Sequence, residues 1–80
     1  MSEQKLSERI VVSLNVGHGK PRIAGTRIFV HHILDLIAGG LTIAEITSDD
    51  YFPDITAQDV LACVAYASKI IQYDTIIPVT

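Results

Sequence analysis

The glycine-rich segment Gly17-His18-Gly19-Lys20-Pro21 is the first stretch of the sequence that resembles a ligand-binding motif. A phosphate-binding loop needs a glycine five positions before its Gly-Lys pair and a hydroxyl residue directly after the lysine. Leu14 and Pro21 occupy these two positions, so the nucleotide-binding pattern fails. The segment therefore predicts a backbone turn that carries a solvated lysine.

His31 and His32 are the next candidates, because imidazole is a common metal ligand. Consecutive side chains on a helix point about 100° apart, so these two rings cannot hold one metal as a pair spaced i, i+4 does. His18 is the only other histidine of the chain. We therefore expect no metal site, and we expect these histidines to lie at a helix start or an interface.

Four carboxylates cluster near the middle of the chain: Asp49, Asp50, Asp54 and Asp59. Metal-dependent nucleases use converging carboxylates, but a simpler account suffices because Asp59 suits a helix cap and Asp54 suits a turn after Pro53. The single cysteine, Cys63, lies in an apolar stretch, where a thiol is usually a small buried hydrophobe. The sequence thus predicts no catalytic residue, no cofactor and no enzyme; a carboxylate-based hydrolase is the least favoured alternative.

Charge is distributed unevenly along the chain. Residues 1–32 hold five cations and two carboxylates, a net charge of +3, whereas residues 33–80 hold one cation and seven carboxylates, a net charge of −6. Nucleic acid is bound through cations that neutralise its phosphates, so the basic part would contact it. The predicted phosphate contacts are Lys20, Arg22 and Arg27.

Two similar helix starts lie in the acidic part. Glu45 follows Thr42 by three residues, and Asp59 follows Thr56 by three residues. At this spacing a hydroxyl and a carboxylate satisfy the unpaired N–H groups of a first helical turn. Pro53 lies between the two starts and ends the first helix, because proline removes a donor and forces the preceding residue out of the helical region.

The sequence therefore predicts a short helix over 43–50, a tight linker and a long helix over 57–71. Such a pair has the form of a helix-turn-helix, and equally the form of any packed helix pair. In a helix-turn-helix, Thr56 and Gln58 would contact phosphate or base edges. No cation follows them until Lys69, so a core helix is the stronger interpretation.

A small β element and one further helix are predicted ahead of this pair. β-branched residues over 10–14 favour a strand, and partial alternation over 27–30 favours a second strand that pairs with it. From His31 the apolar residues recur at helical spacing until Gly39-Gly40 ends the helix. The predicted fold is α+β and mainly α, a short two-stranded β element followed by three helices.

This fold makes one domain over 1–80, in four successive parts: a flexible segment over 1–9, the β element over 10–30, three helices over 31–71 and an apolar C-terminal segment over 72–80. The last segment is too short for a core of its own. We expect it to contact a partner through Tyr73, Ile76, Ile77 and Val79.

The composition predicts exposed apolar surface that a second subunit or a partner protein would bury. Hydrophobic residues make up 49% of the chain and charged residues 19%, and a chain of 80 residues buries little of its surface alone. We therefore expect a homodimer. No run approaches the roughly 18 to 20 apolar residues of a membrane span, and the first residues lack the order of a signal peptide, so we expect a cytoplasmic protein without membrane contact.

The segment from Gly19 to Val30 resembles a known family. Its sequence, Gly-Lys-Pro-Arg-Ile-Ala-Gly-Thr-Arg-Ile-Phe-Val, is similar to the Gly-Lys-Pro-x-Ile-x-Gly-Thr-Arg-Ile-Pro-Val stretch of the domain-of-unknown-function family 433, a group of small bacterial proteins. The resemblance continues over 33–41, 51–55 and 59–67 and covers roughly residues 10–70. Phe29 departs from the family, because it stands where proline is usual.

The resemblance implies a homeodomain-like helix-turn-helix and a role as the antitoxin of a toxin–antitoxin pair. It implies a toxin similar to a PIN-type ribonuclease, and operator DNA as a second ligand through which the pair represses its own transcription. The alternative is a protein-interaction module or dimeric scaffold with a degenerate helix-turn-helix that does not bind DNA. The net charge of the helical part favours this alternative.

Overall fold

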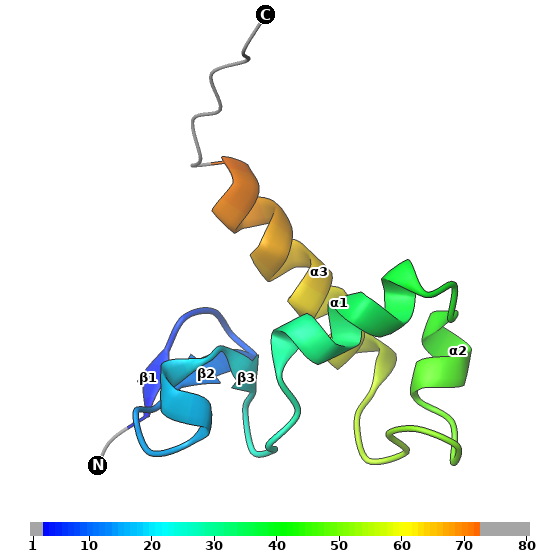
Figure 1. Ribbon diagram of the computed structural model, residues 1–80, viewed down its shortest axis with the longest axis horizontal. Helices are drawn as coiled ribbons and strands as arrows, with labels where there is room; N and C mark the ends of the chain where they lie inside the picture. Colours follow the sequence, from blue (N-terminus) through cyan, green and yellow to red (C-terminus); the bar gives the residue numbers. More distant parts are fainter. Residues whose placement is uncertain (1–2, 73–80) are drawn as a thin grey trace, which may run out of the picture.

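A small antiparallel sheet forms one side of the molecule, and three helices form the other (Figure 1). The computed structural model describes residues 3–72. The chain has an α+β fold in which the strands come first and the helices follow, as the sequence predicts.

Three strands form the sheet, in the order β1 (Gln4–Lys5), β2 (Ile10–Val12) and β3 (Arg22–Ile23). The prediction of two strands was therefore one strand short. β1 lies within the segment predicted to be flexible. Its two residues are polar and exposed, so only the pairing with β2, and not the local sequence, makes this segment a strand.

The predicted second strand over 27–30 was wrong. Phe29 forms only an isolated bridge with β3, which precedes that range. The reason is a tight turn at Thr26, whose hydroxyl donates to the carbonyl of Ile23 at 2.8 Å and accepts from the N–H of Ile28 at 3.0 Å. The first helix begins directly after Phe29, so no room is left for a strand.

The helices are α1 (Val30–Ala38), α2 (Ile43–Ile46) and α3 (Ala57–Gln72). Both predicted caps are present. The hydroxyl of Thr42 accepts from the N–H of Glu45 at 3.2 Å, and the Glu45 carboxylate accepts from the N–H of Thr42 at 2.8 Å. Thr56 and Asp59 form the same pair of bonds, at 3.3 Å and 3.0 Å, at the start of α3.

α2 is shorter than predicted, because it ends at Ile46 and not at Asp50. The hydroxyls of Thr47 and Ser48 donate to helix carbonyls, at 3.0 Å to Ile43 and at 2.6 Å to Glu45. Such side-chain bonds compete with the continuation of a helix. Residues 47–56 join α2 to α3, so the predicted tight linker is also wrong.

One core joins the sheet to the helices. Its buried residues come from two strands, all three helices and the segment before α3: Ile10, Ile23, Val30, Ile33, Ile46, Ile55, Val60 and Cys63. α3 packs against both β2 and α1, so it is the element around which the others assemble. Within residues 3–72, no helix combines the length and the apolarity that crossing a bilayer requires.

Candidate functional site

An apolar groove lies between the start of α1 and the C-terminal half of α3. It has a volume of about 270 Å³ and is lined by Lys20, Pro21, Val30, His31, Leu34, Tyr66, Ala67, Ile70 and Ile71. We call it the α1–α3 groove. Ile70 and Ile71 are 47% and 63% exposed, although both are large aliphatic side chains. The groove therefore offers concave apolar surface, and only three of its lining residues, Lys20, His31 and Tyr66, carry a polar side-chain group.

Local contacts fix the wall of the α1–α3 groove. The N–H of Val30 donates to the carbonyl of Pro21 at 3.0 Å, which ties the loop before β3 to the first turn of α1. The ring of His31 stacks on Phe29 with 5.6 Å between centroids. These contacts hold the loop and the helix start together, so the groove is largely formed before any partner binds.

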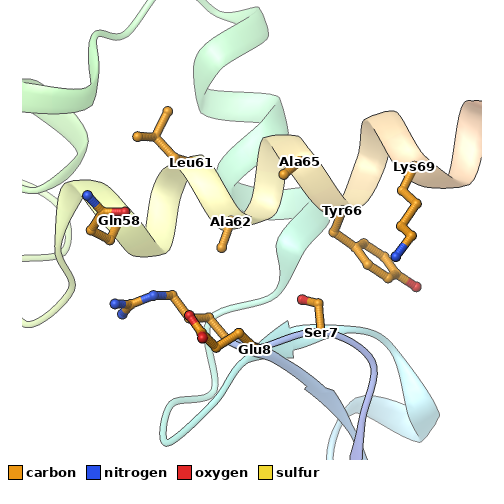
Figure 2. A pocket seen from close by; sticks show the side chains of 9 residues that line it. Ser7, Glu8, Gln58, Leu61, Ala62, Ala65, Tyr66 and Lys69 are labelled. Carbon is orange, nitrogen blue, oxygen red and sulfur yellow. The ribbon is translucent and has the colours of Figure 1, made fainter.

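A second hollow, of about 400 Å³, separates α3 from the β1–β2 hairpin (Figure 2). Figure 2 shows Ala62 and Tyr66 pointing toward the hairpin, whereas Leu61 points away from it. Ser7, Glu8 and Arg9 line the hairpin side. This hollow mixes polar and apolar walls, and an ion pair crosses from the hairpin to the start of α3.

That ion pair joins Arg9 to Asp59 at 3.0 Å. Burial alone would raise the pKa of the Asp59 carboxyl. Hydrogen bonds from the N–H and hydroxyl of Thr56, together with Arg9, outweigh burial and lower that pKa. Asp59 is thus a charged structural group that caps α3 and anchors the hairpin, and Arg9 is not a free cation.

The predicted phosphate contacts do not form one cluster. Arg22 is only 6% exposed, and its guanidinium donates to Ser13 at 2.8 Å, to Glu3 at 3.2 Å and to the carbonyl of Thr26 at 3.3 Å. A cation enclosed in this way does not reach a phosphate backbone. In this conformation Arg22 holds the sheet together.

The other two predicted cations are exposed but belong to different surfaces. Lys20 lines the α1–α3 groove, whereas Arg27 lines a hollow beside Arg22 and Glu3. Thr56 and Gln58 are exposed at the start of α3, and Gln58 also lines the hairpin hollow. The fold therefore presents three separate small polar surfaces and no continuous basic face among the predicted residues.

The predicted partner contacts Tyr73, Ile76, Ile77 and Val79 lie outside the described residues. Sequence reasoning did not locate the α1–α3 groove. A signal for it exists, because α3 carries more apolar residues than one buried stripe can use. Val60 and Cys63 fill the core, and the remaining aliphatic side chains must face solvent or a partner.

The metal-ligating side chains and the single cysteine were the candidate chemical groups of the sequence. No three His, Cys, Asp or Glu side chains of this range come together as a metal site. Burial, with a smaller contribution from Asp59, raises the pKa of the Cys63 thiol to about 11. This cysteine is buried in the core, as predicted, and the thiolate that a nucleophile requires is scarce at neutral pH.

Comparison with known proteins gives one match. No curated protein and no solved structure matches the chain. The model of the family described as "Protein of unknown function (DUF433)" matches residues 10–67, which include the Gly-Lys-Pro turn, the core of the sheet and most of α3. The chain therefore belongs to the DUF433 family, as its sequence resemblance indicated.

Proposed function

We propose that this chain is a non-enzymatic protein-binding module of the cytoplasm, the antitoxin of a toxin–antitoxin pair. The α1–α3 groove carries this proposal, because exposed concave apolar surface is typical of sites that bind a partner protein. The groove suits an apolar helix or strand of the partner. The proposal that the partner is a PIN-like ribonuclease toxin rests on the family resemblance alone.

The negative net charge of this chain supports a partner protein with a basic surface. Residues 33–80 carry a net charge of −6, and the chain carries −3 overall. A nuclease that binds RNA needs a basic surface, and an acidic protein attracts such a surface while it repels nucleic acid. In this proposal the groove supplies apolar contact and the acidic part steers the encounter.

The test is coexpression of the chain with the protein encoded beside it, followed by copurification. Ile70→Glu places a charge in the α1–α3 groove and should abolish copurification. Leu14→Glu is the matched control, since Leu14 is 71% exposed and is not part of the groove lining. Copurification that survives Ile70→Glu would remove the groove from this role.

Operator DNA is the second candidate ligand, in a homeodomain-like helix-turn-helix formed by α2 and α3. The exposure of Arg27, Thr56 and Gln58 favours it. The long segment over 47–56 and the scarcity of cations on α3 speak against it. If DNA is bound, Arg27→Ala should weaken binding to the chain's own promoter at every sequence and flatten the salt dependence. Equal affinity of the variant and the wild type would exclude Arg27 as a phosphate contact.

A further inference from the structure

One face of α3 is exposed along its length and carries no charge. Its residues recur at alternating spacings of four and three: Ala57, Leu61, Val64 and Ser68. We call this the α3 face. Leu61 and Val64 are 48% and 41% exposed, although neither lines the α1–α3 groove. The only charged residues of α3, Asp59 and Lys69, lie off this face, and Lys69 lines the hairpin hollow beside it.

The spacing of the α3 face is the one that packs two helices along a shared seam. Exposed aliphatic residues scattered singly need no partner, but a continuous apolar row on one helix indicates an interface. Every residue of the α3 face is exposed, so another helix can lie along it.

We infer that the occupant of the α3 face is a second copy of this chain, whose own α3 lies antiparallel to the first. This inference deepens the homodimer expected from composition and rests on the proposed role as a protein-binding module. With the two-fold axis between Val64 and Ala65, Leu61 of one copy lies opposite Ser68 of the other. Val64 likewise lies opposite Ala65. Ala57 lies opposite Gln72 in the same register, so a large side chain meets a small one in each of these three layers and this part of the surface is complementary to itself.

Charge selects the antiparallel direction. The carboxylates of Glu45, Asp49, Asp50 and Asp54 lie in α2 and in the segment that leads to the start of α3. A parallel pair would bring these acidic ends together. An antiparallel pair separates them and brings Lys69 of each copy near the acidic start of α3 in the other. The helix dipoles also oppose each other in this arrangement.

The size of the α3 face sets the strength of the dimer. A helix of 16 residues is roughly 24 Å long, so its single face is smaller than the about 800 Å² per partner of a standard interface. The dimer should therefore dissociate reversibly on dilution, and it leaves the α1–α3 groove open for another protein.

Sedimentation equilibrium over a wide concentration range tests the dimer. The wild type should shift from monomer to dimer as concentration rises, and Leu61→Glu should raise the dissociation constant at least about tenfold, because pairing would bury a charge. Leu14→Glu, an equally apolar-to-acidic change at an exposed site elsewhere, should behave as the wild type. Circular dichroism checks that the variants fold. A wild type that stays monomeric, or a Leu61→Glu variant that dimerises like the wild type, would overturn the inference.

Crosslinking tests the direction. Cys63 is buried, so an introduced cysteine is the accessible thiol of the described part of the chain. Ala65→Cys lies beside the axis and should form a disulfide-linked dimer. Ala57→Cys should not crosslink with itself but should crosslink with Gln72→Cys in a mixture. Efficient self-crosslinking of Ala57→Cys would refute the antiparallel pair.

Partner binding separates this inference from the proposed function. If the dimer forms through the α3 face while the groove binds the toxin, Leu61→Glu should lose the dimer and keep copurification with the neighbouring protein. Ile70→Glu should show the reverse. Loss of both properties in Leu61→Glu would mean that the α3 face binds the toxin, and would overturn the assignment to a second copy.

Discussion

Asp59 connects two parts of the chain that are distant in sequence. It caps α3 through Thr56 and holds the β1–β2 hairpin through Arg9, at 3.0 Å in each case. Its neighbours stabilise the charged carboxylate, so the pKa of Asp59 is lower in the folded chain than its ordinary value of 3.8. A carboxyl group whose pKa is lowered by folding stabilises the protein above the ordinary pKa, and this stabilisation is lost as the pH falls through the folded pKa.

We therefore predict that the free energy of unfolding falls between pH 6 and pH 3, and that Asp59→Asn reduces this fall. The difference should be about 1 kcal/mol or less, because Arg9 is partly exposed and solvent screens the pair. Arg9→Ala should give an intermediate result, since it leaves the bonds to Thr56 in place. Urea titrations at the two pH values measure the effect. An Asp59→Asn variant with the full wild-type fall would contradict this account.

The residues also show what sequence alone can specify. The caps Thr42 to Glu45 and Thr56 to Asp59 were predicted correctly, because partners three residues apart need no knowledge of the fold. Arg22 and Arg27 look equivalent in the sequence. Only the sheet decides that Arg22 lies against Ser13 and Glu3 while Arg27 remains exposed.

The turn over residues 17–19, before β3, depends for its geometry on the ring of Phe29, which lies ten residues further along the chain. Gly17, His18 and Gly19 all adopt positive φ, and a Cβ atom at Gly17 would collide with the ring of Phe29. Phe29 stands where the family usually has proline. The ring therefore fills space that only glycine leaves open.

Gly17→Ala should consequently destabilise the fold more than Gly25→Ala. Gly25 also has a positive φ, of 78°, but a Cβ there meets no atom within 4 Å, so only the backbone cost of about 1–2 kcal/mol applies. Displacing Phe29 should add at least about 1 kcal/mol for Gly17→Ala. Chemical denaturation of the two variants measures the difference. Equal destabilisation would show that the ring does not constrain this turn.

At the same scale, the lengths of the two long helices were predictable from the sequence, and the length of the short helix α2 was not. α1 and α3 have long periodic patterns with clear ends, and their predicted ranges match closely. α2 ends early because the side-chain hydroxyls of Thr47 and Ser48 donate hydrogen bonds to its backbone carbonyls. β1 was not predicted because only its pairing with β2, and not its local sequence, makes it a strand.

Across the whole molecule, composition predicts unpaired apolar surface but not its location. The core uses only Val60 and Cys63 from α3 as fully buried residues, although α3 is the longest element. The surplus falls on two sides of one helix, the α1–α3 groove and the α3 face. Their separation depends on which side of α3 packs beside α1, which local patterns do not specify (Figure 1).

Hydrogen exchange of the chain, free and bound to the protein encoded beside it, tests the central claim most directly. We predict slower exchange at amides around Lys20, His31 and Leu34 and over the C-terminal half of α3, with no change in α2. Protection confined to α2 and residues 47–56, or protection nowhere in the chain, would contradict a function based on the α1–α3 groove.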